Sequence, residues 1–193
     1  ILAQNRAYNG GGAYSHYSTP KLYNNRAYAN TATNVAGGFG LDQVSGALFV
    51  NNTSASNNAG GGGAGVYFKS PSTTTMTNNI VASNQSGVLL SGGALTIKNN
   101  CVYGNTAYQY SGLTNPTGTN GNISVDPKLV DVVSGNLHIQ PTSPCLDAGS
   151  DDAVLTILMD MDGQDRFQGL RVDIGADESD GTAWPSAGAG ARG

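Results

Sequence analysis

Apolar and polar positions recur in a fixed order along the first half of the chain. A large apolar residue stands two positions before a double asparagine, and a small or β-branched residue stands three positions after the first asparagine. A glycine followed by a short apolar run precedes each pair by about a dozen residues. Short apolar runs separated by turn residues predict several β-strands in each copy. The double asparagines of the four copies are Asn24-Asn25, Asn51-Asn52, Asn78-Asn79 and Asn99-Asn100.

The regular period of this pattern predicts a solenoid. Successive copies are 27, 27 and 21 residues apart, and a unit of this size buries its apolar face only by stacking on its neighbours. Helical repeats are excluded, because each copy contains too much Gly and Asn and no helical apolar spacing. Four aligned copies with matching apolar positions also argue against a low-complexity segment. The sequence therefore predicts an all-β parallel β-helix of about four turns over residues 1–107, with turns about 4.8 Å apart.

Asparagine suits the bends of such a solenoid. It tolerates the left-handed backbone conformation of a sharp turn, and its amide group hydrogen-bonds readily. When turns stack, equivalent asparagines also stack, and each amide can donate to the carbonyl oxygen of the next. We expect one such ladder through Asn24, Asn51, Asn78 and Asn99, and a second through Asn30, Asn57, Asn84 and Asn105.

A partial copy precedes the four complete ones, because residues 5–8 repeat residues 25–28 letter for letter. Residue 1 is therefore expected to lie inside a turn. An open solenoid end presents an unpaired strand edge. We expect this edge to pair either with earlier coils or with a neighbouring copy of the chain.

Composition narrows the classes of protein further. A content of 38% hydrophobic and only 11% charged residues is too apolar and too weakly charged for a disordered chain. A net charge of −4 and a pI near 4.8 argue against nucleic acid as a partner, since phosphate binding needs clustered basic residues. No apolar run approaches the roughly 20 residues of a membrane-spanning helix.

A different set of motifs follows residue 107. Residues 108–122 are polar and predict a loop, and three ordered motifs follow at 143–149, 162–166 and 172–178. They read Ser-Pro-Cys-Leu-Asp-Ala-Gly, Asp-Gly-Gln-Asp-Arg and Val-Asp-Ile-Gly-Ala-Asp-Glu. This block resembles the end of bacterial right-handed parallel β-helix repeat proteins in the pectate-lyase-like superfamily. The resemblance implies a right-handed solenoid, an exported protein located outside the cell or on its surface, and a C-terminal β-rich cap over 108–178. Residues 179–193 are expected to form a flexible tail.

The carboxylates of this block have two explanations. Calcium takes six to eight oxygen ligands, although the motif at 160–163 lacks the longer Asp ladder of a calcium-binding hand loop. The alternative is a cluster of ion pairs with Arg166 and Arg171 that closes the cap without any cofactor. We favour the ion-pair cap and keep calcium as the alternative. The candidate calcium ligands are Asp160, Asp162, Asp173 and Asp177.

Catalysis of the kind that the resemblance implies is cleavage of acidic polysaccharides by calcium-dependent lyases or by hydrolases with several aspartates on one face. Glycoside hydrolysis requires a pair of carboxylates. Between residues 13 and 107 the one carboxylate is Asp42, so we assign no catalytic residue. His16 and His138 lack a partner at metal-ligand spacing and are interpreted as solvent-facing strand positions.

Aromatic side chains are concentrated in one coil. Exposed aromatic faces stack on sugar rings, and packing between coils explains them equally well. The four candidates are Tyr14, Tyr17, Tyr23 and Tyr28.

The two cysteines are Cys101, after the last double asparagine, and Cys145, in the terminal block. If the block folds back on the last coil, a disulfide between them would contribute about 3–4 kcal/mol by loop-closure reasoning. The alternative is a pair of buried thiols. An exported protein permits the disulfide.

These observations predict a non-enzymatic structural or adhesion module whose partners are polysaccharide or neighbouring copies assembled into fibres or matrix. The alternative is a carbohydrate-active β-helix that binds or cleaves polysaccharide. The feature that separates them is an acidic cluster on one solenoid face, which residues 13–107 lack.

Overall fold

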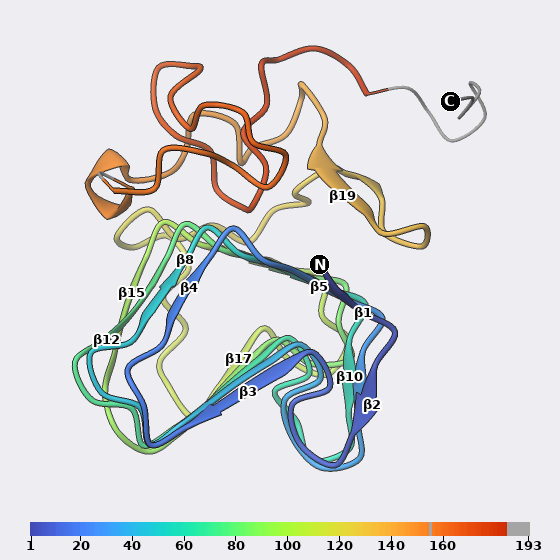
Figure 1. Ribbon diagram of the computed structural model, residues 1–193, viewed down its shortest axis with the longest axis vertical. Helices are drawn as coiled ribbons and strands as arrows, with labels where there is room; N and C mark the ends of the chain where they lie inside the picture. The colour runs from blue at the N-terminus through green and yellow to red at the C-terminus, as the bar shows by residue number, and fades with distance from the viewer. Residues whose placement is uncertain (155, 185–193) are drawn as a thin grey trace.

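The computed structural model describes residues 1–154 and 156–184, which form a parallel β-helix with a loop-rich block beside it (Figure 1). Three longer sheets run along the solenoid, and all their strand pairs are parallel. Sheet I contains β3 (Ala13–His16), β7 (Phe39–Asp42), β11 (Val66–Lys69), β14 (Val88–Ser91) and β17 (Tyr110–Ser111). Sheet II contains β4 (Lys21–Tyr23), β8 (Leu48–Val50), β12 (Thr74–Thr77) and β15 (Leu95–Lys98). Sheet III contains β1 (Leu2–Ala3), β5 (Arg26–Tyr28), β9 (Thr53–Ala55), β13 (Ile80–Ala82) and β16 (Cys101–Tyr103).

A short fourth sheet joins sheet III to the next strand of sheet I. It contains β2 (Arg6–Ala7), β6 (Thr31–Ala32) and β10 (Asn58–Ala59). In Figure 1 the successive coils lie almost over one another, so equivalent residues of each copy stack. The predicted all-β parallel solenoid is confirmed.

The register of the strands stacks the apolar positions of the repeat into one narrow core. Phe49 pairs with Leu22 on one side and with Met76 on the other, and Met76 pairs with Ile97. Phe39 of sheet I faces Phe49 of sheet II across the interior, with ring centroids 5.0 Å apart in an edge-to-face arrangement. The side chain that recurs before each double asparagine therefore fills the centre of the solenoid.

One asparagine ladder runs where it was predicted, at the corner after sheet III. Each amide Nδ2 donates to the Oδ1 of the equivalent residue one coil on, at 3.0 Å in all four steps from Asn5 to Asn105. The same Oδ1 also accepts the backbone N–H of the previous rung. Asn105 ends the ladder by donating to Oε1 of Gln109. The rungs between these ends are Asn30, Asn57 and Asn84.

The other ladder uses the second asparagine of each pair. The prediction that placed it on the first one is wrong, because only one of its steps forms, from Nδ2 of Asn78 to Oδ1 of Asn51 at 3.4 Å. The rungs of the observed ladder stand 2.9–3.1 Å apart between Nδ2 and Oδ1 and are Asn25, Asn52, Asn79, Asn100 and Asn122. The first asparagine of each pair adopts the left-handed backbone, with φ between 50° and 56°, and makes the bend. That bend turns the side chain of the second asparagine inward and that of the first outward. These outward residues, here called the bend asparagines, are Asn24, Asn51, Asn78 and Asn99.

The solenoid continues beyond the predicted boundary at residue 107. Strand β17 pairs with β14, and Ile123 forms a bridge with Cys101. Asn122 is the last rung of the ladder that begins at Asn25. Residues 108–123 are therefore a further, incomplete coil rather than a loop that leaves the stack. The sequence pattern missed it because a single asparagine replaces the double one.

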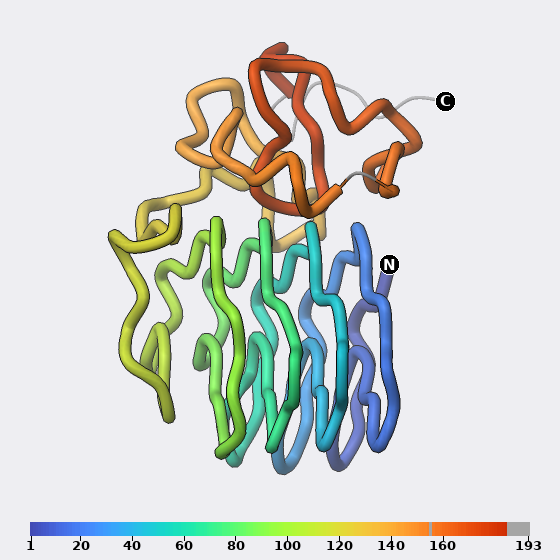
Figure 2. Tube along the Cα trace, turned by 90° about the vertical axis from the view of Figure 1, so that its left-hand side faces the viewer, coloured from blue at the N-terminus to red at the C-terminus, as the bar shows by residue number. Residues whose placement is uncertain are grey.

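The terminal block lies along the flank of the solenoid and does not cover its end (Figure 2). It contains the antiparallel strands β18 (Leu129–Asp131) and β19 (Asn136–Ile139) and the 3₁₀ helix η1 (Asp151–Ala153), with loops between them. The predicted β-rich cap is thus a loop-rich cover of sheets II and III. The reason is that the outer faces of these sheets are partly apolar. Ile80 and Cys101 pack against Ile139, Cys145 and Ile174 of the block.

The predicted tail begins later than expected. The backbone N–H of Ser179 donates to Asp173, and the Trp184 ring stacks on His138 with centroids 3.7 Å apart. Residues 179–184 therefore belong to the block. The remainder of the predicted tail, 185–193, lies outside the described residues.

A substitution in a central rung tests the ladder. Asn57→Ala removes an acceptor from the backbone and side-chain amides of Asn30 and a donor from the carbonyl of Ala27. Because buried polar groups without partners are costly, we expect a loss of about 3 kcal/mol in the free energy of unfolding. Urea denaturation measures it. Asn58→Ala, the same change at the exposed neighbouring position, should cost far less, and an equal cost at both positions would contradict the ladder.

Candidate functional site

The bend asparagines connect every complete coil to the terminal block. Nδ2 of Asn51 donates to the carbonyl oxygens of Asp173 and Gly175, at 3.2 and 3.1 Å. Asn78 accepts the backbone N–H of Ser150 at 2.8 Å and donates to its carbonyl oxygen. At the two ends of the row, Asn24 donates to Met159 and Asn99 donates to Ala148. One row of outward amides thus holds the block along the axis.

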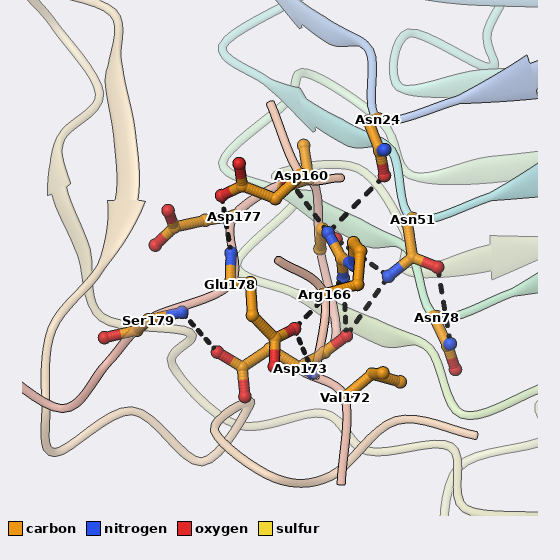
Figure 3. Close-up of polar contacts among 12 residues, drawn as sticks. Asn24, Asn51, Asn78, Asp160, Arg166, Val172, Asp173, Asp177, Glu178 and Ser179 are labelled. Carbon is orange, nitrogen blue, oxygen red and sulfur yellow. Dashed lines mark hydrogen bonds and ion pairs between the residues drawn. The ribbon is translucent and has the colours of Figure 1, made fainter. Parts of the chain in front are cut away.

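The centre of the block is the guanidinium of Arg166, which has no exposed surface (Figure 3). Its two terminal nitrogens donate to the carbonyl oxygens of Asp173, Gly175 and Ala176 at 3.0–3.2 Å. Nη2 also lies 3.5 Å from a carboxylate oxygen of Glu178. Arg166 therefore fixes the 173–178 segment in the conformation that the bend asparagines bind.

The buried carboxylates around Arg166 mainly accept backbone N–H groups. Asp160 accepts from residues 162, 164 and 178, using both of its oxygens. Asp173 accepts from residues 147 and 179, also with both oxygens. Glu178 accepts the N–H of residue 173. The carboxylates thus supply the hydrogen-bond acceptors that a neighbouring strand would supply in a sheet, and which the loops of the block otherwise lack.

Burial of several carboxylates beside one guanidinium leaves an excess of negative charge. Four carboxyl groups in the block are nearly inaccessible to solvent, those of Asp160, Asp173, Asp177 and Glu178. Burial raises the pKa of Asp173 to about 6, that of Asp177 to about 7 and that of Glu178 to about 8. Burial also lowers the pKa of Arg166, and the surrounding carboxylates oppose that shift. The block therefore favours an additional positive charge, carried by protons or by another cation.

A second cluster adjoins these carboxylates and contains His138 on β19. Nε2 of His138 lies 2.6 Å from Oδ2 of Asp162 and 4.0 Å from Oδ1 of Asp177. The sequence placed His138 on a solvent-facing strand position, and this is wrong, because the residue is 8% exposed and covered by Trp184. Its partners lie 24 and 39 residues away, and only the folding of the block brings them together.

The four candidate calcium ligands separate into two pairs in the structure. Asp162 and Asp177 converge with His138, and their ligand atoms lie within 4.8 Å of one another. Asp160 and Asp173 do not belong to this group, because backbone N–H groups occupy their oxygens. The predicted ion pair of Arg171 is also not seen in the described part of the chain. Only the backbone N–H of Arg171 contacts a carboxylate, that of Asp147.

The four tyrosines do not share one face. Tyr23 packs with the block beside Val50, and Tyr28 lies against the backbone at Gly135. Tyr17 is 70% exposed. Tyr14 lies on the outer face of sheet I, where its hydroxyl donates to Asp42 at 3.0 Å. A continuous aromatic platform is therefore not formed.

The cysteine side chains meet where the block contacts the last complete coil. Both are buried free thiols in the same apolar cluster. A hydrogen bond with Cys101, together with burial, raises the pKa of the Cys145 thiol. Because thiolate is the form that reacts, these surroundings slow oxidation. The disulfide stays a prediction.

Comparison with protein families supports the architecture that the strands define. The family described as right-handed β-helix region matches residues 1–126. The chain belongs to this family. The match covers the solenoid with its incomplete last coil and ends before the terminal block. No curated protein and no solved structure matches the chain.

In this member of the β-helix family, replacement of Arg166 tests the centre of the block. Arg166→Gln removes the donors to three carbonyl oxygens and leaves the Glu178 carboxylate buried without its partner. Breaking a buried ion pair on one side costs about 3–5 kcal/mol. Hydrogen exchange in residues 145–178 should become faster in the variant than in the natural chain, and the increase should be larger there than in the coils. Arg171→Gln, at an exposed position, should leave the exchange unchanged, and an unchanged pattern in Arg166→Gln as well would contradict this role.

The raised pKa values of the buried carboxyls predict a pH dependence. A carboxyl whose pKa is higher in the folded protein than in the unfolded chain stabilises the fold at low pH, and this contribution is lost as pH rises through the folded pKa. In the presence of a chelator, the melting temperature of the block should therefore fall between pH 5 and pH 9, through the values of about 6 to 8. Glu178→Gln should reduce the fall above pH 7. A melting temperature that rises across this range would contradict the assignment.

Proposed function

We propose that this chain is a rigid structural module of an exported bacterial protein, located outside the cell or on its surface. The observation that carries the proposal is the row of bend asparagines, since all four are hydrogen-bonded to one block along the flank. This block contacts the coils from the side, so bending or separating the coils requires breaking its contacts. Such an arrangement favours a stiff rod that holds other segments at a fixed distance.

The chemistry of the coil faces supports a non-enzymatic role. Asp42 is the one carboxylate in residues 1–123, and a glycosidase requires two.

No helix in the described residues is long and apolar enough to cross a membrane. We propose polysaccharide or further copies of the chain as partners. A further copy would pair with the outer edges of β3 and β4, which pair with no strand in the part of the chain that the structure describes.

A second candidate function is action on polysaccharide at sheet I. Three polar side chains converge on the buried carboxylate of Asp42 on the outer face of this sheet. The Tyr14 hydroxyl is 3.0 Å away, His16 Nδ1 is 3.3 Å away and Lys69 Nζ is 3.4 Å away. The cluster combines one carboxylate with basic groups on an open face, which suits binding of an acidic sugar more than hydrolysis.

Incubation with acidic and neutral polysaccharides separates the two functions. We expect no new reducing or unsaturated chain ends, because the coil faces lack a second carboxylate. Turnover that disappears in Asp42→Asn and persists in Asp126→Asn would overturn the structural proposal and support the second candidate.

Sedimentation of the same samples measures the proposed partners. Binding should appear as a faster-sedimenting species, either with polysaccharide or, at high protein concentration, without it. A monomer under all of these conditions would contradict both partners.

A further inference from the structure

Three separate segments of the terminal block place ligand atoms around one point. His138 comes from β19, Asp162 from the turn at 160–163, and Asp177 from the segment that Arg166 fixes. Their ligand atoms all lie within 4.8 Å of one another. Ligand atoms about 2.1 Å from one metal ion are about 3.4 Å apart in a tetrahedral site, so small side-chain movements bring these three atoms to the separations that an ion requires. The 173–178 segment is held at this point by hydrogen bonds to the solenoid on one side and to Arg166 on the other.

The carboxylate of Asp177 has one oxygen without a partner. Its Oδ2 accepts the backbone N–H of Ile139 at 2.9 Å. Its Oδ1 is buried and has no hydrogen-bond donor among the described residues, although the side chain is only 2% exposed. This oxygen faces Nε2 of His138 at 4.0 Å. A buried carboxylate oxygen without a donor is costly, and a cation at this point removes the cost.

The ring of His138 is oriented as in a metal ligand. Its Nδ1 faces Oδ1 of Asn136, which is identified as the acceptor because it also accepts the backbone N–H of His138. Nδ1 therefore carries a proton, and Nε2 points at the Asp162 carboxylate. At 2.6 Å this contact is a hydrogen bond, with one proton between Nε2 and the carboxylate oxygen. A metal ion would take the place of that proton and would hold the two ligand atoms about 3 Å or more apart, which requires a small displacement of the Asp162 side chain.

The second oxygen of Asp162 is also restrained from outside the cluster. Its Oδ1 lies 3.9 Å from the guanidinium of Arg26 on β5. Each ligand thus has one atom directed at the common point and another held by a neighbour, which is the usual arrangement around bound metals. A cleft of about 240 Å³ adjoins the cluster on the side of Asp177 and is also lined by Gln164 and Trp184.

We propose that His138, Asp162 and Asp177 bind one divalent transition-metal ion of the Zn²⁺ class. The imidazole nitrogen selects against calcium and magnesium, which prefer oxygen ligands throughout, and favours zinc and its neighbours. The site differs from the calcium site expected from the sequence, because it uses a histidine and excludes Asp160 and Asp173. The ion joins the β18–β19 hairpin, the 160–163 turn and the 173–178 segment, and so stabilises the block on the solenoid.

Calorimetric titration of the full chain with Zn²⁺, after treatment with a chelator, tests the site. We expect one ion per chain and a higher melting temperature of the block when zinc is bound. His138→Gln and Asp177→Asn should each weaken binding by on the order of 100-fold. Asp165→Asn removes the same charge from an exposed position in the adjoining loop and should bind zinc like the natural chain. Melting without metal establishes that each variant is folded.

Several outcomes overturn the proposal. One is the absence of saturable zinc binding by the natural chain, which leaves a histidinium–carboxylate pair at this position. Another is equal affinity in His138→Gln and the natural chain. Zinc binding that is lost in Cys101→Ala with Cys145→Ala but kept in His138→Gln would assign the ion to the thiols. Saturation by calcium that is independent of His138 would restore an oxygen-ligand site.

Discussion

The stacked asparagine amides set the geometry on which the rest of this structure depends. Each buried rung donates to the next coil and accepts from the one before, so the two ladders fix both the spacing and the register of the coils. With this register, Phe49 lies between Leu22 and Met76 in the core. It also aligns the bend asparagines in one outward row. The stacking of the core side chains and the outward row that binds the block thus both follow from one repeated hydrogen bond between asparagine amides.

The terminal block solves a different physical problem, because it has few strands to pair its backbone. Buried carboxylates accept N–H groups, and Arg166 donates to carbonyl oxygens, so side chains take the role of a sheet. The consequence is a concentration of negative charge that one guanidinium does not balance. Protons on raised-pKa carboxyls, or a metal ion at His138, complete the balance. The chemistry of the molecule is therefore concentrated in the block, whereas the coils provide shape.

This division bears on function within the right-handed β-helix family. The family match ends at residue 126, just beyond the incomplete last coil. The faces of the solenoid, residues 1–123, carry one carboxylate, Asp42, which is already engaged by Tyr14, His16 and Lys69. The elements most strongly held are those that maintain the shape of the solenoid, and the structural role proposed above rests on this distribution.

Local pattern alone determined the solenoid, since the repeat of apolar residues and asparagines at 27, 27 and 21 residues allows stacked coils and few other folds. It also located the bends at Asn24, Asn51, Asn78 and Asn99. It did not show which asparagine of each pair turns inward, because that depends on the backbone direction after the bend. The position of the block on the flank and the meeting of His138 with Asp162 and Asp177 arise between distant segments. Only tertiary structure decides these contacts, because sequence spacing carries no information about which buried oxygens the backbone has already occupied.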